Sequence, residues 1–144
     1  MAAGNIGDSI RTYLMGVAAV TAVTNRMYSD VLGQGATLPA IVYRIVSGEH
    51  AHHLKGSANF GETVIQIDCI DDSHTGRDDA DALAEIVRKN LTSYSGTVGG
   101  DKINNILAST PRYRYEQPRD GKGIGRFVHS RDYRVFHAEP AVST

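Results

Sequence analysis

Three histidines in the middle of this 144-residue sequence are the first residues whose spacing suggests chemistry. His50, His52 and His53 form an H-x-H-H cluster, and imidazole nitrogens are common ligands of zinc and other transition metals. A closed site needs further ligands, and the sequence contains no CxxC or HExxH motif to supply them. We therefore favour a solvated or interface-forming segment over a metal site, and expect no metal and no cofactor.

The single cysteine, Cys69, is the next candidate for chemistry. Its neighbour Asp68 cannot assist it directly, because adjacent side chains of a strand point to opposite faces. A pairing of Cys69 with His129 across two strands is geometrically possible, but a small buried apolar side chain explains Cys69 more simply. A lone cysteine makes no intrachain disulfide, which fits synthesis in a reducing cytoplasm.

Two further patterns resemble functional sites only in part. The segment Gly121–Gly125 (GKGIG) resembles a phosphate-binding loop, but such loops open a helix, whereas this one precedes a strand-like run. A hairpin turn is the better interpretation. The carboxylates between Asp71 and Asp81 could hold a cation, yet helix capping and the helix dipole account for most of them. We therefore expect a protein that is not an enzyme.

The first half of the chain predicts a helix followed by strands. Apolar residues at helical spacing begin at Ile6 and reach Val17, and a short helical piece is expected over Ala18–Thr24. A short strand is expected at Arg26–Tyr28. Two stronger strands, Ala40–Ser47 and Glu62–Ile70, alternate between apolar and other residues. Between them we expect a long polar loop, Gly48–Gly61, and loops of this length usually carry function.

The second half begins with the best-defined helix. Thr75 is placed to cap it, aspartates crowd its first turn, and Arg88 and Lys89 lie in its last turn, as the helix dipole favours. One face is apolar and consists of Ala80, Leu83, Ala84, Val87 and Leu91. Strands are then expected at Ile103–Ala108, Arg112–Glu116 and Arg126–His137.

This order predicts an α+β fold, an antiparallel β-sheet with two main helices packed on one face. The length suits a single domain over residues 1–144, and a composition of 41% apolar and 22% charged residues is that of a globular protein. The apolar stretch Met15–Val23 is too short to cross a membrane. With a net charge of −1, the whole chain has no electrostatic attraction for nucleic acid.

The charges nevertheless separate along the chain. Gly61–Asn90 holds eight acidic residues against three basic ones, and Pro111–His137 holds seven basic residues against three acidic ones. Two zones of opposite sign could attract copies of the chain to each other, although two ordinary solvated faces would explain them equally well.

Four stretches together resemble the bacteriophage tail-completion family, which includes tail terminator (tail-to-head joining) proteins. They are the opening helix at Ser9–Met15, Asn25–Tyr28 followed by Leu38–Tyr43, Val64–Asp68 followed by the helix through Leu91, and the closing Arg131–His137. The chain departs from the family pattern at Ser29–Asp30, where a proline is common, and at Cys69–Ile70, where an aromatic residue is common.

The resemblance implies a structural virion protein at the head-proximal end of the tail, made in the host cytoplasm. It implies a hexameric ring that caps the tail tube, ends tube growth and joins the tail to the head connector, with DNA only passing through the lumen. It supplies no catalytic residues and no membrane partner. The alternatives are another phage neck protein (head-completion or adaptor), a small metal-binding cytoplasmic domain using the histidines, and a generic interaction domain.

Within this frame we place two candidate surfaces. Ring closure needs two different patches on each subunit, so acidic residues of one copy are expected to face basic residues of the next. That candidate interface consists of Asp78, Asp79, Asp81, Glu85, Arg112, Arg114, Arg126 and Arg131. The long polar loop is expected to contact the tube or a neighbouring ring through His50, His52, His53, Leu54 and Lys55.

Overall fold

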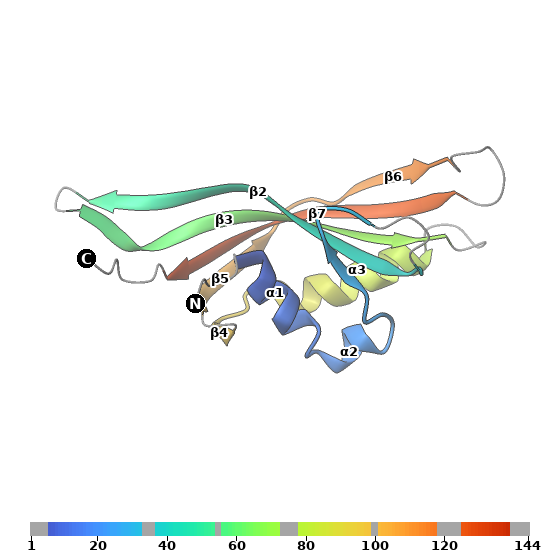
Figure 1. Ribbon diagram of the computed structural model, residues 1–144, viewed down its shortest axis with the longest axis horizontal. Coiled ribbons are helices and arrows are strands. Elements are labelled where there is room, and N and C mark those ends of the chain that lie inside the picture. Colours follow the sequence, from blue (N-terminus) through green and yellow to red (C-terminus); the bar gives the residue numbers. More distant parts are fainter. Residues whose placement is uncertain are drawn as a thin grey trace.

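The computed structural model describes residues 6–32, 37–53, 56–72, 78–98, 101–117 and 125–138, with the backbone alone at 47–53, 56–60 and 138. Three helices and seven strands follow each other along these residues (Figure 1). They are α1 (Ile6–Leu14), α2 (Ala18–Thr21), β1 (Met27–Ser29), β2 (Ala40–His53), β3 (Gly56–Asp71), α3 (Asp78–Leu91), β4 (Gly96–Val98), β5 (Asp101–Ala108), β6 (Arg112–Glu116) and β7 (Arg126–Ala138).

All seven strands belong to one sheet, in the order β1-β2-β3-β7-β5-β4. β6 also pairs with β7, and it does so along residues 126–130, whereas β5 pairs along residues 133–137. Every pairing is antiparallel except that of β1 with β2, which is parallel. The prediction of an antiparallel sheet is therefore wrong for the β1–β2 pair. The connection 30–39 is long enough to return the chain to the same end of the sheet, which a tight turn cannot do.

The prediction of a long loop over Gly48–Gly61 is also wrong, because most of these residues belong to β2 and β3. β2 and β3 form one long hairpin whose register continues through His50↔Gly61 and His52↔Ser57, with irregularities between Ile45 and Ser47 and between His50 and His52. Figure 1 shows this hairpin extending beyond the layer of helices. A strand outside that layer has no apolar face to bury, so the alternation that reveals a strand in a sequence is missing.

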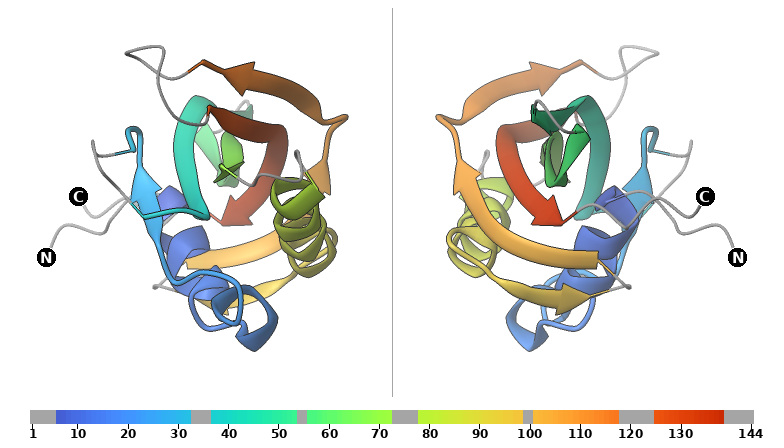
Figure 2. Two further views of the ribbon diagram at one scale, coloured as in Figure 1. Left: turned by 90° about the vertical axis from the view of Figure 1, so that its right-hand side faces the viewer. Right: turned by 90° about the vertical axis from the view of Figure 1, so that its left-hand side faces the viewer.

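The helices lie together on one face of the curled sheet (Figures 1 and 2). α1 and α3 are the two main helices that were expected, and α3 contains the charged turns and the apolar face predicted for it. The predicted cap, Thr75, lies outside the described residues. The α+β prediction is nevertheless confirmed only in part. Strands hold far more of the described residues than helices, and the sheet curls into a half-barrel instead of lying as a flat layer under two helices.

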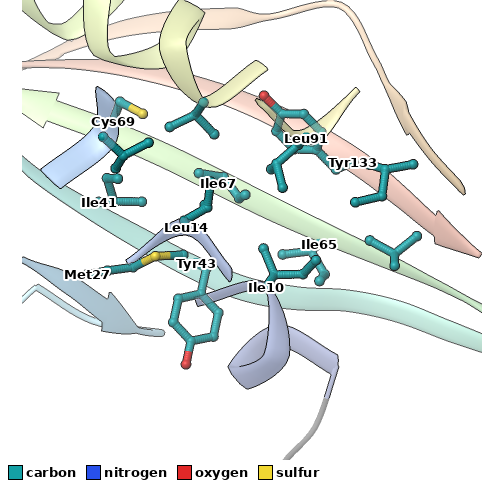
Figure 3. Close-up of a cluster of buried hydrophobic side chains, with 14 of the residues drawn as sticks. Ile10, Leu14, Met27, Ile41, Tyr43, Ile65, Ile67, Cys69, Leu91 and Tyr133 are labelled. Carbon is teal, nitrogen blue, oxygen red and sulfur yellow. The ribbon is translucent and has the colours of Figure 1, made fainter. Parts of the chain in front are cut away.

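The main core lies between the helices and the sheet (Figure 3). The alternation predicted for β3 is confirmed, since Ile65, Ile67 and Cys69 all face this core and are at most 2% exposed. α1 adds Ile10 and Leu14, and α3 adds Leu83 and Leu91, among other residues. A much smaller cluster on the opposite face of the sheet consists of Val42, Ile70 and Val128. The helices therefore protect one face and leave the other available to polar side chains.

Candidate assembly surfaces

The sheet face turned away from the helices carries a network of paired charges. At its centre Asp68 on β3 is fully buried. Its carboxylate accepts a hydrogen bond from the amide of Gln66 at 3.0 Å. It also lies 3.4 Å from the guanidinium of Arg44 on β2 and 3.8 Å from that of Arg114 on β6. One buried carboxylate thus links three strands of the sheet.

Three arginines of this face have further carboxylate partners. Arg112 donates to Asp132 at 2.9 Å, Arg114 lies 3.1 Å from Glu116, and Arg134 lies 2.8 Å from Glu62. A hollow of about 310 Å³ opens among them and is lined by Gln66, Arg112, Tyr113, Arg114 and Ser130. Because each of these arginines faces a carboxylate, the face is polar without a large surplus of positive charge.

The acidic candidates lie on the other side of the sheet, on α3. Asp78 and Asp79 are exposed in its first turn. Asp81 Oδ1 lies 2.9 Å from His129 Nδ1 and accepts a hydrogen bond from it in the tautomer that carries the proton on Nδ1. Glu85 pairs with Arg88 one turn along the helix. The Arg88 hydrogen bonds lower the pKa of Glu85, and the positive charge of Arg131 contributes less.

The basic candidates do not form a single patch. Register places Arg112, Arg114 and Arg126 on the face away from the helices, because Arg112 is opposite Ser130 and Arg126 is opposite Glu116. Arg131 lies on the helix side and donates to the carbonyl of Ser109 at 2.8 Å. The acidic group and most of the basic group therefore occupy opposite sides of one subunit. Several members already have partners within the chain, which the sequence could not show.

Cys69, His129 and Asp81 come together in an arrangement that resembles a nucleophile, a base and its orienting acid. Cys69 is opposite His129 in the β3–β7 register, and His129 contacts Asp81. Cys69 is only 1% exposed, however, and burial raises the pKa of its thiol far above the ordinary value. A protonated, buried thiol is not a nucleophile, so the interpretation of Cys69 as a core residue is the better supported one.

The structure describes only the backbone of the histidine cluster. His50, His52 and His53 belong to β2, and their side chains, like all of Leu54 and Lys55, lie outside what the structure describes. Among the described side chains, no group of three or more His, Cys, Asp or Glu residues is arranged to hold a metal ion. No helix within the described residues is long and apolar enough to cross a membrane.

Two exposed groups of apolar residues were not singled out from the sequence. Ile45 and Val46 on β2 are 40% and 54% exposed, and Tyr113 and Tyr115 on β6 are 48% and 46% exposed. The available signal was the alternation of arginine and tyrosine in β6 and the run of β-branched residues in β2. Neither sequence pattern shows whether a neighbouring strand or helix covers these side chains in the folded protein.

The fold and these surfaces define a class of protein: a small, mostly β-sheet domain with helices on one face of the sheet and ion-paired charges on the other. The family described as tail completion protein gp17 matches residues 8–130, and the chain belongs to this family. The resemblance seen in the sequence is thereby confirmed. The chain is a bacteriophage tail structural protein in the sense of that family.

A solved structure shares the fold. A chain from the virion of a native gene transfer agent particle is 14% identical and superposes with a TM-score of 0.64, covering 91% of this chain and 92% of that one. A second solved structure, 16% identical over 92% of this chain and 96% of the other, has a TM-score of 0.48, too low to support an argument. No curated protein sequence matches the chain significantly.

Proposed function

We propose that the chain is a tail terminator subunit, which forms a ring on the head-proximal end of the tail tube, ends tube growth and then joins the tail to the head connector. The single observation that carries this proposal is the tail-completion family match over residues 8–130. In this role the chain acts by binding other proteins, namely copies of itself, the tail tube protein and a connector protein. DNA passes through the lumen of the ring, and assembly takes place in the host cytoplasm.

The distribution of charges supports the ring. A closed ring requires a heterologous interface, in which two different surfaces of each copy meet. Exposed Asp78 and Asp79 lie on the helix side of the subunit and Arg126 lies on the opposite face, so the two signs are available to different neighbours. We propose that the acidic group on α3 of one copy faces the basic group of β6 and β7 on the next.

The β2–β3 hairpin is the proposed contact with the tube or the adjoining ring. It extends beyond the helices (Figure 1), and its two strands remain paired out to His53↔Gly56. A paired hairpin holds its end at a fixed distance from the sheet, which a free loop of the same length would not do. This contact includes the positions His50, His52, His53, Leu54 and Lys55.

Electron microscopy of particles from a producing strain that lacks this gene tests the function. We expect filled heads beside unjoined or abnormally long tails, and restoration of joined particles when the gene is supplied again. Tails of normal length beside unjoined heads would instead favour a head-completion or adaptor role. Intact particles in the deletion strain would refute every role in the neck.

A matched complementation tests the hairpin. A gene shortened by removing residues 50–59, which leaves the paired core of β2 and β3 in place, is expected to produce a folded protein that does not restore joining. The control is the wild-type gene expressed from the same vector at the same level. Normal joining by the shortened protein would remove the hairpin from the contact.

A further inference from the structure

The hollow on the outer face of the sheet, which is the face turned away from the helices, is lined mostly by hydrogen-bond donors. Among the described residues its lining consists of Gln66, Arg112, Tyr113, Arg114 and Ser130, none of which is acidic. Asp68 contacts Gln66 and Arg114 but is fully buried, so its carboxylate is not exposed in the hollow. Guanidinium and amide donors of this kind suit a carboxylate ligand.

Both arginines of the hollow are held in place and still keep donors for a ligand. The carboxylate of Asp132 and the hydroxyl of Ser130 accept hydrogen bonds from Arg112, and the carboxylate of Glu116 accepts one from Arg114. These contacts use only part of the five N–H groups that each guanidinium carries. A second carboxylate can therefore bind to guanidinium groups whose positions are already fixed.

The helix side of the sheet carries exposed carboxylates at one end. Asp78 and Asp79 are exposed in the first turn of α3, and neither has a basic partner among the described residues. Burial raises the pKa of the nearby Asp71, and the negative charges of Asp79 and Asp72 raise it further. The carboxylates at this end therefore repel each other, and positive charge from outside the subunit would stabilise them.

The carboxylates and the hollow lie at the same level along the strands. Asp81, in the first turn of α3, lies 2.9 Å from His129 of β7. On β6, Arg112 and Arg114 are opposite the two β7 residues that flank His129. The first turn of α3 and the hollow therefore lie at one level, on opposite sides of the sheet.

Within one copy the sheet separates these two groups, so only a second copy can bring them together. A rotation about an axis along the strands moves a copy sideways and leaves every residue at its own level. Such a rotation can place the helix side of one copy against the outer face of the next. The first turn of α3 then lies opposite the hollow, and the opposite charges of the two surfaces attract each other.

We propose that the first turn of α3 of one copy docks into the hollow of the next copy, where the carboxylate of Asp78 or Asp79 binds between the guanidinium groups of Arg112 and Arg114. The two surfaces are different, so the contact is heterologous and repeats until a ring closes. The inference rests on the proposed ring with its acidic and basic groups. It adds the site that receives the carboxylate, the residues that enter it and the direction of the ring axis.

This contact also determines how each subunit stands in the ring. The strands run along the ring axis, and the helix side of each copy faces the outer face of the next. The β2–β3 hairpin extends beyond the helices in the direction of the strands (Figure 1), so it projects from one end of the ring. Contact with the tube or an adjoining ring takes place at an end of this kind.

Disulfide cross-linking in assembled particles tests this docking. Ala82 is exposed one turn after Asp78 on α3, and Gln66 and Arg112 approach the hollow from β3 and β6. Particles complemented with Ala82→Cys and Gln66→Cys, or with Ala82→Cys and Arg112→Cys, are oxidised with copper phenanthroline, and their proteins are separated without reducing agent. We expect a ladder of cross-linked oligomers for at least one pair. Cys69 can stay in place because it is only 1% exposed.

Single variants and a displaced pair serve as controls. Ala82→Cys alone or Gln66→Cys alone should give no ladder, since each surface meets a different surface. Lys89→Cys with Gln66→Cys uses an exposed position seven residues further along α3, about 10 Å from Ala82, and should cross-link several-fold less. Ala82 and Gln66 are uncharged, so their replacement leaves every ion pair in place.

Three results would overturn the docking. They are the absence of a ladder from both pairs in particles that contain the variants, dimers from Ala82→Cys alone, and equal cross-linking of the Lys89→Cys pair. Each of them leaves the terminator role intact if the deletion strain still makes unjoined or overlong tails. Normal particles in the deletion strain would refute the terminator role, whatever the cross-linking shows.

Discussion

At the scale of single residues, Asp68 is a buried charge with partners on two other strands. It is fully buried, whereas the side chains of its partners Arg44 and Arg114 are 40% and 47% exposed. Removing the buried carboxylate takes the hydrogen-bond acceptor from the amide of Gln66 and the shared counter-charge from both arginines. Removing one arginine, by contrast, leaves Asp68 with its other partners. Asp68 therefore contributes to stability mainly by connecting β2, β3 and β6.

We predict that Asp68→Asn lowers the free energy of unfolding by about 2–3 kcal/mol, measured by urea denaturation. The matched control is Asp132→Asn, which removes the partner of Arg112 at a side chain that is 30% exposed. Its cost should stay at or below about 1 kcal/mol, as for other exposed ion pairs. Equal losses in the two variants would mean that Asp68 does not connect the strands.

Tyr43 gives a prediction that depends on pH. Its hydroxyl donates to the carboxylate of Asp8 at 2.7 Å, and burial together with this hydrogen bond raises the pKa of Tyr43 to about 12. The folded-state pKa lies above the unfolded one. The contribution of Tyr43 to stability is therefore complete below about pH 10 and is lost as the pH rises towards 12.

The stability of wild-type protein relative to Tyr43→Phe should accordingly decrease between pH 10 and 12, and stay constant from pH 7 to 9. Urea denaturation at each pH measures this difference. Absorbance at 295 nm follows tyrosine ionisation in the folded protein, and one tyrosine fewer should titrate near pH 12 in the variant. A pH-independent difference in stability would contradict the assignment.

At the scale of elements, the pairing of β6 with β7 depends on Gly125. A Cβ atom at this buried position would lie 2.3 Å from the carbonyl oxygen of Glu116 and 2.4 Å from the ring of Tyr115. Neither the backbone of β6 nor a ring packed against Phe127 can move without disturbing the pairing of the two strands. Gly125 is therefore needed for the close approach of β6 to β7.

We predict that Gly125→Ala loosens β6 and leaves the rest of the sheet in place. Hydrogen exchange should accelerate in residues 112–116 and remain unchanged in β3. Gly16→Ala is the control, because its Cβ would meet only ordinary contacts, at 3.4 Å and 3.7 Å from backbone oxygens. Unchanged exchange in β6 would show that the neighbouring atoms accommodate the added methyl group.

At the scale of the whole molecule, the acidic group on α3 and the basic group of β6 and β7 lie on opposite sides of the sheet, as the proposed ring contact requires. The proposed contact between the acidic and basic groups is best tested by reversing the charges of Asp78, Asp79 and Arg126. These residues have few partners within their own subunit. Asp78→Lys with Asp79→Lys should lower the yield of joined particles about tenfold or more, as should Arg126→Glu, because like charges then meet at the interface. Combining all three changes should restore joining.

Restoration in the combined variant is the informative result, since a variant that merely misfolds would not recover. Thermal unfolding of each purified variant provides the control for folding. Normal joining of tails to heads in the two charge-reversed variants would show that these charges are solvated and do not contact a neighbouring copy.

The sequence by itself determined the features that depend on neighbours along the chain. The apolar spacing of α1, the charged ends of α3 and the alternation at the centres of β2 and β3 were enough to place those elements and their buried faces. Helical and strand periodicities report which side of an element faces a core. The family resemblance followed from the order of these same elements, and the match over residues 8–130 confirmed it.

The tertiary structure alone decided which strands are neighbours and which side chains find partners. The parallel β1–β2 pair, the strands in place of the predicted Gly48–Gly61 loop, and the internal pairing of Arg112 and Arg114 could not be read from local patterns. A polar strand shows no alternation, and an ion pair such as Arg44–Asp68 joins residues that only the fold brings together. Strand edges and exposed faces are properties of the assembled sheet, because a strand becomes an edge only where no other strand lies beside it.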